Sequence, residues 1–227
     1  MFIGHFAPAF VAAAVMPERP RLGLYFFAAQ LVDWAFFAFL LLGVEDMRIV
    51  PGITAMNPMD LYHLPYTHSL VGSAGFAAGF AVSVWLVTRD RMASVLAGAV
   101  VLSHWLLDLL VHRPDLTLAG AAPKLGFGLW NYPVIEMPLE LLLTFGAMAW
   151  FLSRTRGYVL PALVLALLLL GFQLVNWFGP EPDSVTPALS YAGFFAFGVL
   201  TLAASWLGRK RRVKPQDEGL AQTRRAV

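Results

Sequence analysis

The sequence predicts an all-α, polytopic transmembrane helix bundle of about seven spans. Of its 227 residues, 59% are hydrophobic and only 13% are charged, and the mean hydropathy is +0.67. A soluble globular protein carries about 25% charged residues, and a chain with far fewer could not cover a water-exposed surface with polar groups. The same composition excludes a disordered chain and a nucleic-acid-binding protein with a basic face.

Seven apolar stretches make up the predicted bundle. Six of them contain roughly the 20 residues that are needed to cross a hydrocarbon core of about 30 Å. The first is shorter and contains Pro8. It would reach only about 22 Å as a straight helix, so we expect either a short span or a re-entrant segment. The stretches are 2–16, 22–44, 69–87, 92–111, 134–153, 158–178 and 188–207.

Basic residues predict how the bundle is oriented. The outer connections hold only Arg48, Arg113 and Lys124, whereas the other thirteen Lys and Arg lie in alternate connections and in the tail. Connections rich in Lys and Arg stay in the cytoplasm, so we expect the N-terminus outside and the C-terminus inside. The thirteen are Arg19, Arg21, Arg89, Arg91, Arg154, Arg156, Arg209, Lys210, Arg211, Arg212, Lys214, Arg224 and Arg225.

The domain organisation is expected to be simple. Residues 1–208 form one transmembrane helical domain, and residues 209–227 form a basic cytoplasmic tail that contacts anionic lipid headgroups. The first residues lack the charged region of a secretory signal, so we expect them to belong to the fold. The chain contains no cysteine, so any transition-metal site would have to use His, Asp and Glu.

Ionisable side chains gather in the outer half of the predicted bundle. Burying such side chains in a membrane costs free energy, so their presence there indicates a functional site. Asp33 lies within the second stretch. His104 and Asp108 are four residues apart in the fourth stretch, so they share one helix face. His68 begins the third stretch, and His5 lies near the outer start of the first.

Imidazoles and carboxylates without cysteine are typical of a first-row metal site. We therefore predict a divalent metal bound by His5, Asp33, His68, His104 and Asp108. Zinc is the first choice, with manganese and iron as alternatives. Each residue taken alone could instead make a hydrogen bond between helices, and it is their shared depth that favours a metal or proton-transfer site.

Further polar residues are candidates for catalysis. His63, in the loop before the third stretch, is a candidate general acid or ligand. Glu136 and Glu140, near the outer start of the fifth stretch, are candidate bases for a bound water. His112 is interpreted as a rim residue because a loop follows it.

The connection 45–67 is rich in Pro, Met and Tyr. We expect either an interfacial lid over the site, with Asp60 and His63 facing it, or an ordinary surface loop.

Two motifs resemble those of the membrane-bound metal-dependent hydrolase family, which are polytopic bacterial proteins. His63-Leu-Pro-Tyr-Thr-His68-Ser-Leu is similar to the family's HRGxTHSL motif, and Ser103-His104-Trp-Leu-Leu-Asp108 is similar to its SHxxLD motif. Gly4-His5 and Gln30-Leu-Val-Asp33 take the places of its early histidine and its PDxD element, although Ala35 replaces the second acid. The resemblance covers about residues 1–115.

The resemblance implies a function and a location. His5, Asp33, His63, His68, His104 and Asp108 would be the metal-site residues of a hydrolase that acts on a lipid-like or phosphoester substrate. The reaction would take place at the extracytoplasmic face of the bacterial cytoplasmic (inner) membrane. Membrane lipids are the expected partners, and nucleic acid is not.

Two other classes of function remain open on the sequence. A transporter or permease could use the same residues to relay protons or bind a cation, although we expect no broken-helix pair of the kind common in transporters. A non-catalytic membrane scaffold is the third class.

Overall fold

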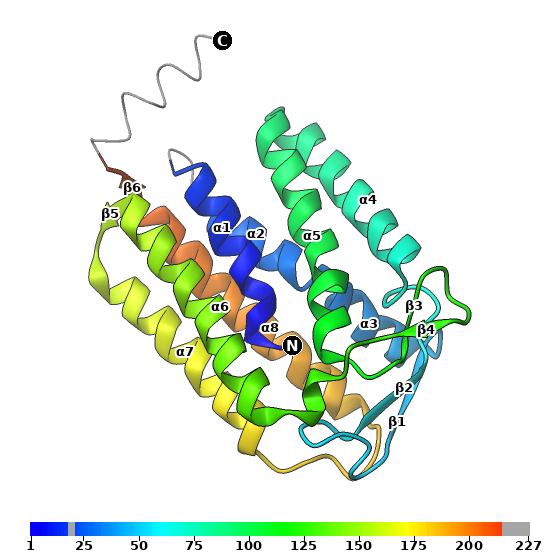
Figure 1. Cartoon of the computed structure of the whole chain (residues 1–227). Helices are drawn as coiled ribbons and strands as arrows, with labels where there is room; N and C mark the ends of the chain where they lie inside the picture. Colours follow the sequence, from blue (N-terminus) through cyan, green and yellow to red (C-terminus); the bar gives the residue numbers. More distant parts are fainter. Residues whose placement is uncertain (18–20, 215–227) are drawn as a thin grey trace.

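The computed structural model describes residues 1–17 and 21–214, and it is a bundle of helices with small β-hairpins gathered at one end (Figure 1). Five helices of the described residues are long and apolar enough to cross a membrane. The predicted class, a helical bundle with membrane-spanning helices, is confirmed to this extent. The five are α4 (Leu70–Thr88), α5 (Arg91–Val111), α6 (Pro133–Arg154), α7 (Val159–Phe178) and α8 (Pro187–Arg209).

The second apolar stretch is broken. It forms α2 (Leu22–Ala29) and α3 (Leu31–Leu42), which meet at Gln30 with a bend of 48°. Counting the pair as one span gives six spans. The expected absence of a broken-helix pair was therefore wrong. The stretch ends at Gly43, whose φ of 68° is the left-handed conformation that closes a helix at low cost in glycine.

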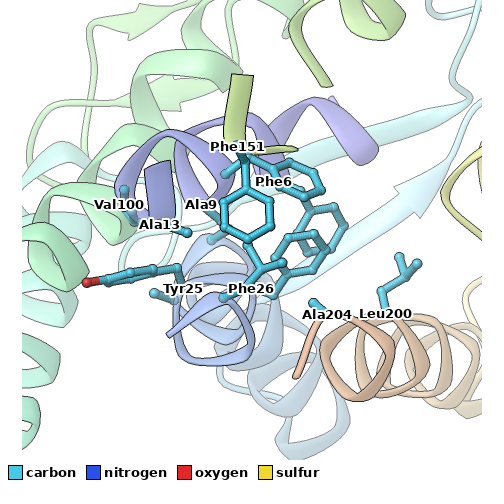
Figure 2. Close-up of a cluster of buried hydrophobic side chains, with 14 of the residues drawn as sticks. Phe6, Ala9, Ala13, Tyr25, Phe26, Val100, Phe151, Leu200 and Ala204 are labelled. Atoms are coloured by element: carbon cyan, nitrogen blue, oxygen red, sulfur yellow. The ribbon is translucent and has the colours of Figure 1, made fainter. Parts of the chain in front are cut away.

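The first stretch folds inside the bundle. It consists of a 3₁₀ turn, η1 (Ile3–Phe6), followed by α1 (Ala7–Val15), and together these are too short to meet the length of a span. In Figure 2, Ala9 and Ala13 of α1 lie among the rings of the buried core. The rings of Phe6 and Phe26 stack with their centroids 4.4 Å apart. Other helices pack around α1 on several sides, so the backbone polar groups at its ends are buried in protein rather than exposed to lipid. A helix shorter than the membrane is tolerated in such a position.

Small residues bring α2 and α8 into close contact. A Cβ atom on Gly23 would lie 1.8 Å from the Ser205 side-chain oxygen, so only glycine fits there. Membrane helices associate through such close packing because lipid tails are as apolar as the side chains they replace. The contact holds the broken pair against α8.

The hairpin end replaces the predicted loop over 45–67. The strands β1 (Asp46–Ile49) and β2 (Met59–His63) pair as an antiparallel hairpin. The hairpin packs on α3 through Phe36, Met47, Leu61 and Leu64. Asp60 is buried and pairs with Arg48, at 2.8 Å, and with Arg113. A second hairpin, β3 (Leu116–Thr117) with β4 (Lys124–Leu125), and a 3₁₀ turn, η2 (Leu129–Asn131), complete this end.

The opposite end carries the start of the predicted tail. The strand β6 (Arg211–Val213) pairs with β5 (Thr155–Gly157), which links α6 to α7. Arg209 still belongs to α8, and residues 211–214 are held to the bundle by backbone pairing. The remainder of the predicted tail, 215–227, lies outside the described residues.

Candidate metal centre

Six side chains converge at the hairpin end of the bundle, where α5 ends and α4 begins. They come from five places along the backbone. His5 lies in η1, Asp33 in the first turn of α3, His68 two residues before α4, His104 and Asp108 one turn apart in α5, and His112 directly after α5. Five of the six are buried, and the Asp33 side chain is 19% exposed.

Asp108 is the centre of this cluster. Its Oδ1 lies 3.0 Å from His5 Nε2 and 3.4 Å from His112 Nε2. Its Oδ2 lies 3.1 Å from His104 Nε2 and 3.8 Å from His68 Nε2. Each oxygen of one carboxylate therefore faces two imidazole nitrogens. The Met1 amine also donates to Oδ1, at 3.3 Å.

Asp33 provides a second carboxylate on one side of the cluster. Its Oδ1 lies 3.3 Å from His104 Nε2 and 3.7 Å from His68 Nε2. The His5 and His104 rings stack in parallel, with centroids 3.8 Å apart, so their Nε2 atoms reach opposite oxygens of Asp108. Asp33 is also where the cluster is most open.

Hydrogen bonds on the far side fix the tautomer of His104. Its Nδ1 lies 2.8 Å from the carbonyl oxygen of Ala29. A carbonyl can only accept, so Nδ1 carries the proton and a neutral ring has its Nε2 lone pair towards the two carboxylates. Ala29 is the last residue of α2, where backbone carbonyls lack intrahelical partners. The helix break thus supplies the group that orients His104.

His68 and His112 are oriented in the same way. Thr67 donates its hydroxyl proton to Glu45 Oε2 at 2.5 Å, so its oxygen accepts from His68 Nδ1 at 2.9 Å. The Nδ1 atom of His112 donates to Asp115 Oδ1 at 2.9 Å. In both rings Nε2 is the nitrogen that faces Asp108.

This arrangement suits a cation between nitrogen lone pairs and carboxylate oxygens. Among the described residues, His104 Nε2 and both ring nitrogens of His5 have no hydrogen-bond partner, although all three atoms are buried. Metal-ligating histidines typically donate their other N–H to a carboxylate, a backbone carbonyl or water, and His104 and His112 have partners of the first two kinds. Three overlapping groups of three could hold a metal ion: His5, His104 and Asp108; Asp33, His68 and His104; and His68, Asp108 and His112.

The five predicted ligands all lie in this cluster, and the structure adds His112. Sequence reasoning placed His112 at the rim because of the loop that follows it. It lies four residues after Asp108, on the same helix face, and that spacing could have indicated its place. Trp130 covers its outer side, with the ring centroids 4.2 Å apart.

Glu140 accepts hydrogen bonds from the start of the chain and from α7. Its Oε1 accepts from Phe2 N at 2.6 Å and from Gly4 N at 2.9 Å, and its Oε2 accepts from Gln173 Nε2 at 2.8 Å. The Gln173 oxygen accepts from Ile3 N at 3.2 Å. This buried pair, contributed by α6 and α7, holds the turn that carries His5. Gln173 was not identified from the sequence. The one signal that could have indicated it is an amide side chain within an otherwise apolar stretch.

The other two predicted catalytic residues lie outside the three metal-compatible groups. Glu136 is buried in the first turn of α6, and its Oε2 lacks a hydrogen-bond partner in the described part of the chain. His63 is exposed in β2. It lines a cavity of about 190 Å³ together with Lys124 and Asp115, the partner of His112.

Substitutions should separate His112 from His63. We expect His112→Ala to weaken metal binding by at least the roughly 10- to 100-fold that the loss of an outer-shell partner costs. His63→Ala should leave metal binding unchanged, because the exposed His63 lies outside the groups. Metal content after dialysis against graded chelator measures both, and equal losses in the two variants would contradict the geometry.

Comparison with family models, with curated proteins and with solved structures found no significant match for this chain. The centre described above is therefore interpreted from its own geometry.

Proposed function

We propose that this protein is a membrane-embedded, metal-dependent hydrolase whose centre is the cluster around Asp108. The observation that carries the proposal is the orientation of the histidines. Three Nδ1 atoms are engaged by acceptors, so the Nε2 atoms of His68 and His104 face both carboxylates and that of His112 faces Asp108, at distances of 3.1–3.8 Å. The resemblance of the THS and SHxxLD motifs to a hydrolase family supports the choice of reaction.

The residues present suit a divalent metal with mixed nitrogen and oxygen ligands, for which zinc is the first choice and manganese or iron the alternatives. When bound, such a metal polarises the bond to be cleaved and lowers the pKa of its water towards about 7. His5, Asp33, His68, His104, Asp108 and His112 would hold it. Glu45, Thr67, Asp115 and the Ala29 carbonyl would orient the imidazoles.

Other residues of the chain would handle protons and substrate. Glu136, with one carboxylate oxygen unengaged, is the proposed proton acceptor for the attacking water. His63 lies in the cavity that Asp115 also lines, so a contact with the leaving group is its proposed role. The part-exposed Asp33 marks the side from which a substrate reaches the cluster. A lipid-like or phosphoester substrate fits a centre at this depth.

Metal analysis of the purified protein tests the proposal. Wild-type protein should contain zinc, manganese or iron, and the double variant His104→Ala plus Asp108→Ala should contain none. Metal-loaded protein should release a water-soluble product from phospholipid vesicles, and metal-free protein should release none. The proposal would be contradicted by wild-type protein without bound metal, or by a double variant that contains as much metal as the wild type.

The broken helix supports a second candidate function. Discontinuous helices that meet at a polar site are typical of secondary transporters, and Asp33 lies directly after the break between α2 and α3. On this hypothesis the cluster would bind or relay a cation. Cation flux into proteoliposomes that persists after the metal is removed would favour transport over hydrolysis.

The proposed orientation places the hairpin end outside the bacterial cytoplasmic (inner) membrane. Because the chain has no cysteine, single cysteines can report sidedness. Cysteine at Ala121, between β3 and β4, should react with an impermeant maleimide in intact cells. Cysteine at Arg156, in β5, should react only after permeabilisation. The reverse pattern would place the cluster at the cytoplasmic face.

A further inference from the structure

A second feature of the molecule lies along the stripe of metal-site residues in α5. It is a groove of about 680 Å³, within the size range of ligand sites, formed where the short α1 leaves α5 and α6 apart. Figure 1 shows α1, α5 and α6 running beside one another from the N-terminus towards the end opposite the hairpins. The groove is lined by residues such as Ala7, Val11, Leu96, Leu107, Gly146 and Trp150.

The groove is apolar throughout and opens to the surroundings of the bundle. Its lining consists of Ala, Gly, Pro, Val, Leu and Trp. Val11 and Trp150 are 38% and 43% exposed. Small side chains create the space, and a Cβ atom added at Gly146 would meet no atom within 4 Å. In a bilayer, an apolar surface that opens to the surroundings of the bundle can contact lipid chains.

The groove begins at the depth of the cluster. Leu107 directly precedes Asp108, Ala7 is two residues after His5, and Leu142, another lining residue, is two residues after Glu140. From Leu107 to Leu96 the groove follows α5 for about 16 Å, away from the hairpin end. That length is about half of a hydrocarbon core of about 30 Å, or one leaflet.

We propose that the groove binds one acyl chain of a phospholipid whose headgroup lies at the metal cluster. The proposal rests on the proposed function, and it names the substrate class of that site. A lipid of the leaflet at the hairpin end has its headgroup at the level of Asp108 and its chains pointing towards Leu96, which is the direction of the groove. An acyl chain gains no hydrophobic free energy when it moves from the bilayer into the groove. Binding therefore depends on how well the chain fits the groove and on the contacts of the headgroup with the cluster.

Photolabelling tests the groove without requiring turnover. The full chain is reconstituted in vesicles of phosphatidylethanolamine and phosphatidylglycerol with a trace of phosphatidylglycerol that carries a diazirine midway along one acyl chain. After irradiation, adducts on the α5 and α6 lining should exceed those on the outward face of α7. Labelling that is no stronger in the groove than on α7 would overturn the proposal.

A matched pair of variants tests where the label binds. Gly146→Leu fills the groove and should reduce groove labelling about ten-fold, which corresponds to a loss of about 1.4 kcal/mol of binding free energy. Gly171→Leu makes the same change in α7, where an added Cβ also meets no atom within 4 Å, and should leave groove labelling unchanged. Ala99→Phe fills the groove from α5 in case Gly146→Leu does not fold. Groove labelling that survives both filling variants would overturn the proposal.

The metal content of the same samples separates the two proposals. Filling variants that keep the wild-type metal content while losing the label support the acyl-chain site and show that the fold is retained. Groove labelling in a wild type without metal would reject the hydrolase function and leave the acyl-chain site supported. Bound metal without preferential groove labelling would reject the groove alone.

Discussion

Asp108→Asn is expected to cause the largest loss of metal binding of any single substitution in this protein, because two of the three metal-compatible groups contain Asp108. Asp108 is the residue that all four histidines of the cluster face. Asparagine keeps the side-chain shape, but it removes the negative charge and turns N–H donors towards nitrogens that should act as ligands. The loss should exceed the roughly 10- to 100-fold seen when an outer-shell partner is removed.

The matched control lies at the other end of the same helix. Asp90 caps α5 by accepting from Ala93 N at 3.1 Å, and it pairs with Arg21 at 3.3 Å. Asparagine is an equally good cap, so Asp90→Asn should keep both the fold and the metal. Elemental analysis of the purified proteins measures the outcome. Asp108→Asn protein that retains wild-type metal would show that Asp108 is not a ligand, and it would leave Asp33, His68 and His104 as the group that holds the metal.

Glu140→Gln is expected to destabilise the protein and to weaken metal binding, because Glu140 positions the turn that carries His5. The new amide would direct an N–H group at the Gln173 amide. If Gln173 turned over to accept from it, the Ile3 N–H would lose its acceptor. A buried polar group left without a partner costs about 1–3 kcal/mol. Thermal unfolding in detergent measures the stability, and chelator competition measures the metal affinity.

The exchange variant Glu140→Gln plus Gln173→Glu separates positioning from catalysis. In the exchanged pair the amide at position 140 still accepts from Phe2 N and Gly4 N, and it donates to a carboxylate at position 173. That carboxylate accepts from Ile3 N, so every hydrogen bond is restored. Stability and metal affinity should both recover. A general base at position 140 would not be restored by the exchange, so recovered stability with a lasting loss of hydrolysis would contradict the positioning role.

Much of the cluster could be predicted from the sequence because the bilayer penalises isolated charges. Asp33, His104 and Asp108 stand out in apolar stretches, and helix periodicity alone puts the latter two on one face. Topology then brought His5 and His68 to the same depth. These arguments use only local spacing and the order of the spans, which explains why the five predicted ligands are found together.

Other features could not be predicted because they depend on contacts between distant segments. The break at Gln30 has no proline to mark it, and the last carbonyl of α2 is used by His104 from 75 residues away. The first stretch is shorter than a span, and its place in the bundle comes from packing against α2, α5 and α6.

The sequence by itself determined that this is a helical membrane protein with histidines and carboxylates collected in one half, because composition and periodicity follow from the cost of burying polar groups in lipid. Only the tertiary structure decided what each polar residue does. Glu140 binds backbone N–H groups at the start of the chain, His112 lies in the cluster around Asp108, and His63 lies in β2 outside that cluster. A carboxylate's role depends on which donors the fold brings within about 3 Å of it, and helix spacing carries no information about those donors.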